Sequence, residues 1–221
     1  MYTMKAVERN QSNLSDQVCN YIKRMILAGE IKGGEKIPEE RVGHFFGVSR
    51  TPIREALRRL QQYGLIHIKP RSYAVVVSLE MEEVIQLAHI RAQLETLSVR
   101  LLTEEGTPSD FDYLDSLVED CDSLIAGSDI AGAAEKDSKL HLEIAKRTKS
   151  VHLYEIFEKL DAKMQLAKLI IALPITRLES SINQHTNIIV AMRNGYPDLA
   201  ESLMRHHILH QLKFYNLKLN Q

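Results

Sequence analysis

The chain has 221 residues, of which 44% are hydrophobic and 26% charged, with a formal net charge of −1, so it can bury the core of one large or two ordinary globular domains. No apolar run is long enough to span a bilayer, and the polar residues 1–13 lack the apolar stretch of a secretory signal peptide. Cys19 and Cys121 lie far apart without a CxxC pattern. We therefore expect a cytoplasmic protein with reduced thiols and no membrane partner.

The charge is divided unevenly along the chain. Residues 1–77 contain 13 Lys and Arg against 7 Asp and Glu, an excess of 6 positive charges, and the remaining residues have an excess of 7 negative charges. Such a division indicates that the first part binds a polyanion and the second does not. The alternative is chance variation between two solvated surfaces.

The N-terminal third is predicted to hold three helices and a β-hairpin. Apolar residues recur at helical spacing in three segments, and a glycine follows each of them. Two short β-prone segments come next, separated by a basic tip that contains Arg71. In the second helix we expect Val42, Phe45 and Phe46 to face the interior. The predicted elements are helices over 14–28, 38–46 and 49–63 and strands over 65–69 and 73–77.

The third predicted helix carries an apolar stripe on one face and arginines on another. Arg50, Arg54 and Arg58 step by four residues, with Thr51 beside them. Ser49 or Thr51 can cap the helix, whose first-turn N–H groups can then meet a phosphate. Arginine is well suited to bidentate recognition of guanine in the major groove, whereas a solvated charged face is the alternative. The apolar stripe consists of Ile53, Ala56, Leu57 and Leu60.

A short helix, a tight turn, a basic helix and a basic hairpin in this order predict a winged helix-turn-helix, in which the second helix of the pair enters the DNA groove. Residues 47–60 read GVSRTPIREALRRL, and residues 63–66 read YGLI. Together with the apolar pattern that begins at Leu14, they resemble the N-terminal domain of GntR-family bacterial transcriptional regulators over residues 14–77.

The resemblance implies that Arg50, Thr51 and Arg54 contact DNA, with the hairpin tip near the minor groove. The chain departs from the family at two positions. Tyr73 stands where the tip usually carries glycine, and Glu40 stands where some members carry an arginine. The residues that we predict to bind DNA are Arg41, Ser49, Arg50, Thr51, Arg54, Arg58 and Arg71.

From Met81 onward the chain reads as six helices without strands. The linkers between them are short, so neighbouring helices should pack antiparallel in an all-α bundle. The fold class is therefore mainly α, with domains over 1–78 and 79–221. The six helices are predicted over 81–104, 109–126, 129–148, 151–172, 175–194 and 197–217.

Three of these helices direct a histidine or an aspartate toward the interior. Asp137 and His141 share a face at i, i+4, His185 lies between Ile182 and Ile189, and His207 continues the stripe of Leu199 and Leu203. Burying such groups without partners costs roughly 1–3 kcal/mol each. A shared divalent metal would satisfy them, with zinc first and nickel, manganese or iron as alternatives.

Other roles for these histidines stay open at this point. The chain has nine histidines, and a single one is more often exposed or hydrogen-bonded than a metal ligand. His206 and His210 flank His207, so the pattern alone does not decide which of them faces the site.

The helical part resembles the FCD domain in its shorter, VanR-like form, which belongs to the FadR/VanR-like subfamily. Members with a metal site use Asp-x3-His on one helix and one histidine on each of two later helices, which corresponds to Asp137, His141, His185 and His207 here. The spacing of 22 residues between the last two favours His207 over its neighbours. Arg91 matches the family's Arg-x2-Leu-Glu element and would bind an effector charge, or form a salt bridge with Glu95.

These features predict a ligand-responsive regulator, most often a repressor in this family, that binds an inverted-repeat operator as a homodimer. A small organic acid or sugar acid would be its effector. Two alternatives remain, namely a DNA-binding protein with a purely structural metal or none, and a metal-dependent hydrolase fused to a DNA-binding module. The chain has no HExxH motif and no general base beside the proposed ligands, so we do not expect an enzyme.

Overall fold

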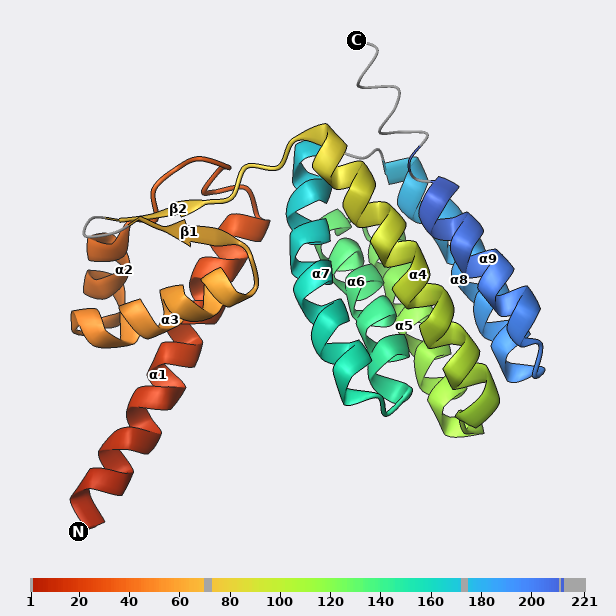
Figure 1. The fold of residues 1–221 in the computed structure, drawn as a ribbon, viewed down its shortest axis with the longest axis horizontal. Helices are drawn as coiled ribbons and strands as arrows, with labels where there is room; N and C mark the ends of the chain where they lie inside the picture. Colours follow the sequence, from red (N-terminus) through yellow and green to blue (C-terminus); the bar gives the residue numbers. More distant parts are fainter. Residues whose placement is uncertain (1, 70–72, 172–174, 211, 213–221) are drawn as a thin grey trace. The chain divides into compact units, whose positions relative to one another are not determined.

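The computed structural model describes residues 2–69, 73–171, 175–210 and 212, and is mainly α-helical over them (Figure 1). The chain divides into two compact units, one formed by Met1–Leu79 with Gln165–Ile170 and the other by Glu80–Met164 with Ile171–Gln221. Among the described helices, none is long and apolar enough to cross a membrane.

The first unit is a winged helix-turn-helix. Its three helices precede an antiparallel hairpin in which Ile66 pairs with Val76 and Ile68 with Ala74. The first helix begins at Tyr2, earlier than the predicted Leu14, because half of the added residues are good helix formers and none is glycine or proline. The elements are α1 (Tyr2–Leu27), α2 (Glu39–Phe46), α3 (Arg50–Gln62), β1 (Ile66–Ile68) and β2 (Ala74–Val76).

The predicted apolar stripe anchors α3 as expected. Its four members are all buried, whereas Arg50 and Arg54 on the other face are exposed. Helix α2 approaches α3 so closely at Gly43 that an added Cβ would lie 2.9 Å from Cδ1 of Ile53. Gly47 then turns the chain at a positive φ of 62°, which a larger residue adopts only with strain. The buried stripe is Ile53, Ala56, Leu57 and Leu60.

The inward orientation predicted for Phe45 is wrong. Val42 is buried, but 67% of Phe45 is exposed, and Phe46 is only partly buried. Helix α2 is so short that the positions four apart, Val42 and Phe46, define its inner face, and Phe45 points about 100° away from Phe46. Its ring instead stacks on Tyr21 of α1, with centroids 5.1 Å apart.

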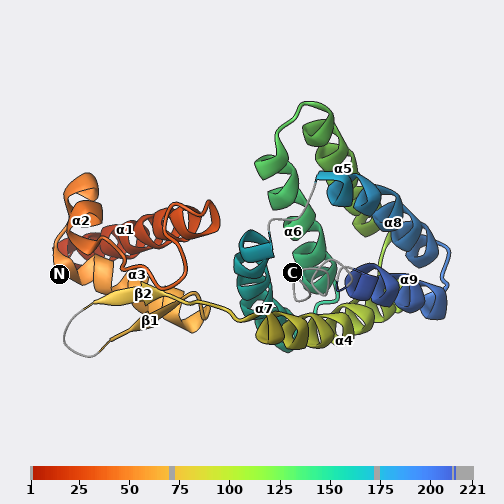
Figure 2. The same ribbon diagram turned by 90° about the horizontal axis from the view of Figure 1, so that it is seen from above.

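The second unit is a bundle of six helices, as predicted (Figures 1 and 2). The predicted helix ends agree with the structure to within about two residues, except that the predicted extension to residue 217 lies largely outside the described residues. Helix α4 packs against α9, and α5 packs against α6 and α8. The helices are α4 (Met81–Glu105), α5 (Pro108–Ala126), α6 (Ile130–Arg147), α7 (Val151–Ile171), α8 (Ile175–Arg193) and α9 (Pro197–His210).

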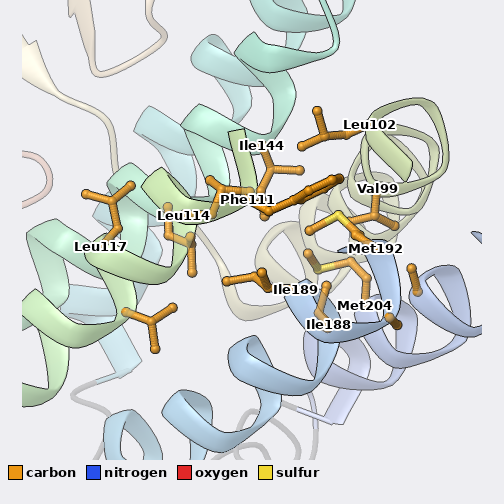
Figure 3. Packing of buried hydrophobic residues seen from close by; sticks show 14 of the residues in the cluster. Val99, Leu102, Phe111, Leu114, Leu117, Ile144, Ile188, Ile189, Met192 and Met204 are labelled. Atoms are coloured by element: carbon orange, nitrogen blue, oxygen red, sulfur yellow. The ribbon is translucent and has the colours of Figure 1, made fainter. Parts of the chain in front are cut away.

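One apolar core joins five of these helices. Figure 3 shows Val99 of α4, Phe111 of α5, Ile144 of α6, Ile189 of α8 and Met204 of α9 around a common centre. Residues three or four positions from a core residue lie on the same face of a helix. The three histidines predicted as ligands lie at that spacing from Ile144, Ile189 and Met204, so the core packing also positions them.

The stripe predicted for α9 needs a correction. Leu199 is 49% exposed and Leu203 is partly buried, whereas Ala200, Met204 and His207 line the buried face. Positions 200, 204 and 207 are related by steps of four and three residues, which keeps them on one face. Eight residues separate Leu199 from His207, and a helix turns by about 80° beyond two full turns over that distance.

Candidate functional site

The outer face of α3 is the candidate DNA-contacting surface. Arg50, Thr51, Arg54 and Arg58 are all exposed, and the first turn of the helix contains no acidic residue. Ser49 occupies the N-cap position with an extended backbone, but its side chain makes no capping hydrogen bond. The hydroxyl and the positive end of the helix dipole are therefore available to an anion.

The other predicted DNA-binding residues have different surroundings. Arg41 is exposed on α2, and Arg71 lies outside the described residues. Arg58 lines an open groove together with Asp16 and Glu55, and Asp16 forms an ion pair with Arg59. Nearby carboxylates reduce the attraction of Arg58 for phosphate, so Arg50 and Arg54 are better placed than Arg58 to contact DNA.

A cluster of charged and polar side chains lies inside the helical bundle, where polar groups need partners. Each member is at most 3% exposed, although charged residues are rarely buried to this extent. Five helices contribute to this buried polar cluster. Its members are Arg91 and Glu95 of α4, Asp137 and His141 of α6, Asp161 of α7, His185 of α8 and His207 of α9.

The three predicted histidines converge within the buried polar cluster. His141, His185 and His207 each offer one ring nitrogen, and these nitrogens lie within 4.8 Å of one another. Nε2 of His185 is 3.1 Å from Nε2 of His207. Asp137, the fourth predicted ligand, lies beside this group, with Oδ1 3.8 Å from Nε2 of His185.

The structure also separates His207 from its neighbours. His206 is exposed, and its ring lies against that of His210, with centroids 5.4 Å apart. Only His207 of these three contributes to the histidine group. The choice that the pattern left open is therefore made by the orientation of α9.

Glu95 connects the predicted effector residue to a predicted metal ligand. One carboxylate oxygen accepts a hydrogen bond from Nε of Arg91, and the other bonds to Nδ1 of His141. Burial alone would raise the pKa of Glu95, but Arg91 and His141 outweigh it and lower that pKa to about 2. The salt bridge considered as an alternative role for Arg91 is thus formed.

The hydrogen bond to Glu95 uses only Nε of the Arg91 guanidinium. Among the residues that the structure describes, the two buried Nη atoms have no hydrogen-bond partner, and neither does the buried Nε2 of His141. Buried donors and acceptors are rarely left unpaired in native proteins, because each costs about 1–3 kcal/mol. The two Nη atoms, which only donate, therefore indicate a further acceptor in the cluster, and Nε2 of His141 indicates a separate partner for a ring nitrogen.

The protonation states of the histidines suit a cation. Burial, together with the charge of His141, lowers the pKa of His185 to about 3. Burial also lowers the pKa of His207 well below its usual value. Both rings are therefore neutral at pH 7, which is the form that binds a metal.

The formal charge of the buried polar cluster supports the same ligand. Counted by residue type, with histidine taken as neutral, Arg91 contributes one positive charge, and Glu95, Asp137 and Asp161 contribute three negative charges, which leaves a formal charge of −2. A divalent cation would balance this charge. Imidazole nitrogens with a carboxylate are ligands that zinc and related transition metals accept, so the residues fit the predicted metal.

Sequence reasoning missed three polar residues around the site. Asp161 is buried and accepts hydrogen bonds of 2.9 Å from the hydroxyl of Ser138. It lies four residues after Phe157 and three before Met164, on an apolar face of α7, and this spacing was a usable signal. Gln184 lies 2.6 Å from Nδ1 of His207, and no pattern in the sequence indicates this contact between α8 and α9.

Two family models match the chain. Residues 14–76 match the model described as bacterial regulatory proteins, gntR family. Residues 86–210, more than half of the chain, match the model described as FCD domain. Together they cover the winged helix-turn-helix and most of the helical bundle.

Several named proteins are similar in sequence over most of their length. The uncharacterized HTH-type transcriptional regulator YdhC of Bacillus subtilis (strain 168) is 27% identical over 195 residues, 88% of this chain and 87% of that protein. The HTH-type transcriptional regulator McbR of Escherichia coli (strain K12) is 28% identical over 152 residues, 69% of each chain. A probable D-xylose utilization operon transcriptional repressor of Paenarthrobacter nicotinovorans is 24% identical over 204 residues, 90% of this chain and 87% of that protein.

Solved structures share the fold. Escherichia coli McbR/YncC superposes with a TM-score of 0.81 at 23% identity, over 93% of this chain and 98% of that one. A putative transcriptional regulator GntR from Rhodococcus sp. RHA1 gives a TM-score of 0.79 at 18% identity, over 91% and 96% of the two chains. The fold class expected from the sequence is thereby confirmed.

Proposed function

The chain belongs to the GntR family of bacterial regulatory proteins and carries an FCD domain, and we propose that a small carboxylate effector at a metal site in this domain modulates its binding to operator DNA. It is a DNA-binding transcriptional regulator rather than an enzyme, because the family and the named relatives are regulators. We assign DNA binding to residues 1–78 and effector binding and dimerisation to residues 79–221. We propose that the protein acts in the cytoplasm, where the operator DNA lies.

The exposed face of α3 supports the assignment of operator recognition. Arg50, Thr51 and Arg54 project from the first turns of a helix whose other face is buried against its own unit. Helix-turn-helix proteins contact base edges from the N-terminal part of this second helix. We propose repression rather than activation, since one relative is named a transcriptional repressor.

The histidine group supports the metal part of the proposal. His141, His185 and His207 would hold a divalent ion, zinc first and nickel, manganese or iron otherwise, with Asp137 as the fourth ligand. When bound, such an ion would supply a positive charge that attracts an anionic effector.

The observation that carries the effector proposal is the buried guanidinium of Arg91. Its two Nη atoms lack partners while Glu95 holds Nε, so the free edge of the group is already oriented. Arginine binds carboxylates through two parallel hydrogen bonds. A small organic acid or sugar acid is the ligand class that satisfies this edge.

The outer face of α4 supports homodimer formation. Leu87, Ile90, Leu94, Leu97 and Leu101 follow the three-and-four spacing of a helix that packs against a second helix, and Ile90 and Leu97 are 52% and 44% exposed. Figure 2 shows α4 along one edge of the bundle. Between residues 84 and 99 no exposed Lys, Arg, Asp or Glu interrupts this face.

A second copy of the chain is the partner that this face fits. A two-fold symmetric interface places the same surface against itself, so a charged surface would repel its copy and an uncharged one does not. Interface centres are typically depleted of charged residues. Two copies would present two α3 helices to an inverted-repeat operator.

Thermal melting of the zinc-loaded protein with a panel of organic and sugar acids tests the metal and effector proposals together. We expect at least one acid to raise the melting temperature, because a ligand of the folded state stabilises it. Chelation of the zinc and the Arg91→Met substitution should each abolish the rise. If the purified protein binds no stoichiometric metal and no acid shifts the melt, the proposal fails and DNA binding without an effector replaces it.

A further inference from the structure

Two side chains outside the proposed ligand set form hydrogen bonds to the imidazole rings of His207 and His141. Oε1 of Gln184 lies 2.6 Å from Nδ1 of His207, and Glu95 bonds to Nδ1 of His141. We propose that Gln184 and Glu95 are positioning residues that fix the tautomers of these two histidines and thereby set the affinity of the site for a divalent metal. This inference rests on the metal site of the proposed function.

The tautomer of His207 follows from its contact with Gln184. An amide oxygen only accepts hydrogen bonds, so Nδ1 of His207 must donate and carries the proton. A neutral imidazole has one protonated nitrogen, which leaves the lone pair on Nε2. That nitrogen faces the histidine group, 3.1 Å from Nε2 of His185.

The tautomer of His141 follows in the same way from Glu95. Glu95 is paired with the guanidinium of Arg91 through Oε1, so its carboxylate acts as an acceptor on both sides and Nδ1 of His141 donates. Its Nε2 is the buried atom without a hydrogen-bond partner. Glu95 and Gln184 thus leave Nε2 of two rings on different helices with its lone pair directed at the histidine group.

The contact between His185 and His207 agrees with this arrangement. Since Nε2 of His207 has the lone pair, a hydrogen bond between the two rings requires the proton on Nε2 of His185. Nε2 of His185 also lies 3.8 Å from Oδ1 of Asp137. For Nε2 of His185 to bind a metal ion, the ring would take its other neutral tautomer, with the proton on Nδ1.

Hydrogen bonds to the far nitrogen of a metal-binding histidine orient the ring and raise its basicity. Gln184 provides the cleaner test of the two residues, because it is only partly buried and its amide contacts His207 alone among the histidines of the site. Glu95 is fully buried and also holds Arg91, so a substitution there changes two interactions.

Substitutions at Gln184 should change the zinc affinity in opposite directions. Gln184→Leu removes the acceptor and should weaken zinc binding by about 10–100-fold. Gln184→Glu replaces the amide oxygen by a carboxylate of the same shape, which is a stronger acceptor, and should strengthen binding. Asn183→Leu, at the exposed neighbouring position, is the matched control and should leave the affinity unchanged.

The measurement is the dissociation constant for zinc of the full chain, by competition with a chromophoric chelator. Thermal melts of the metal-free variants show that each is folded, and the d–d spectrum of the cobalt-substituted proteins reports on coordination. A higher zinc affinity for Gln184→Glu together with a lower one for Gln184→Leu supports the positioning role. Substitution of a merely structural residue would not raise the affinity.

Two results would contradict the inference, and only the second would also contradict the proposed metal site. If the wild type binds zinc at one ion per chain but neither Gln184 variant changes the affinity, Gln184 has no positioning role, and the metal site stands. If the wild type binds no zinc, nickel, manganese or iron, the metal site of the proposed function falls along with it.

Discussion

Arg50 and Arg54 are the side chains on which sequence-specific binding depends most in the proposed function. Both are exposed on the face of α3 opposite its buried stripe, so their replacement removes no packing. A bidentate contact from arginine to guanine contributes about 1–3 kcal/mol of discrimination between bases. We therefore expect each arginine to affect DNA binding without affecting the fold.

The double substitution of Arg50 and Arg54 by alanine should abolish specific operator binding, which fluorescence anisotropy with a labelled operator measures. Its melting temperature should stay that of the wild type. Arg24→Ala, an exposed arginine on α1, is the control for the general loss of positive charge. Normal footprinting by the double variant would show that α3 does not read the operator.

The residues of the buried site differ in how far the sequence predicts them. Asp137, His141, His185 and His207 stand out because polar groups at helical spacing on apolar faces need partners. The same argument identifies their burial but not their mutual distances, which depend on how α6, α8 and α9 pack. The sequence does not predict the contact of Gln184, since its partner His207 lies 23 residues away on another helix and only tertiary packing brings them together.

At the scale of the elements, the N-terminus of α5 is capped with the help of a carboxylate whose pKa is lowered. Asp110 accepts hydrogen bonds from the hydroxyl and the backbone N–H of Thr107, at 2.6 and 2.9 Å, and pairs with Arg147. The hydrogen bonds from Thr107 and the charge of Arg147 lower the pKa of Asp110 to about 2. Helix capping of this kind contributes about 1 kcal/mol.

Asp110→Ala should lower the free energy of unfolding at pH 7 by about 1 kcal/mol, as measured by urea denaturation. Because the folded-state pKa lies below the unfolded value of 3.8, the carboxylate stabilises the protein above about pH 4. This contribution is lost as the pH falls toward 2, so the difference between variant and wild type should shrink below about pH 4. A difference that stays constant down to pH 3 would argue against the ionised cap.

Helix α4 has charged residues among the apolar ones on its inner side, and exposed apolar residues on its outer side. Arg91 and Glu95 belong to the buried polar cluster, whereas Ile90 and Leu97 are exposed. Because apolar residues lie on both sides of the helix, α4 is only weakly amphipathic. A ligand that repositions Arg91 would act on the same helix that forms the proposed dimer interface.

Leu97→Glu should therefore convert the dimer into a monomer, because it places two carboxylates against each other near a two-fold axis. Light scattering coupled to size exclusion measures the molar mass. Val190→Glu, which changes a similarly exposed residue of α8, is the matched control and should remain dimeric. A dimeric Leu97→Glu variant with unchanged dissociation would move the interface away from α4.

For the whole molecule, local patterns predict the elements well and their packing less completely. The glycines and apolar spacing indicate the winged helix and the six-helix bundle, including nearly all helix ends. Phe45 and Leu199 were placed wrongly, since a helix can carry an apolar residue beside its buried face as well as on it. Which of two adjacent positions is inside depends on the neighbouring helix and not on the local sequence.

The most direct test of the regulatory proposal measures operator affinity by fluorescence anisotropy with the zinc-loaded protein. The effector candidate is the acid that stabilises the protein most in the melting experiment. It should change the operator affinity by about 5–150-fold, as expected for coupling between two sites, and the change should disappear after chelation and in Arg91→Met. An operator affinity that is the same with and without this acid, or a change that persists after the metal is removed, would contradict the proposal.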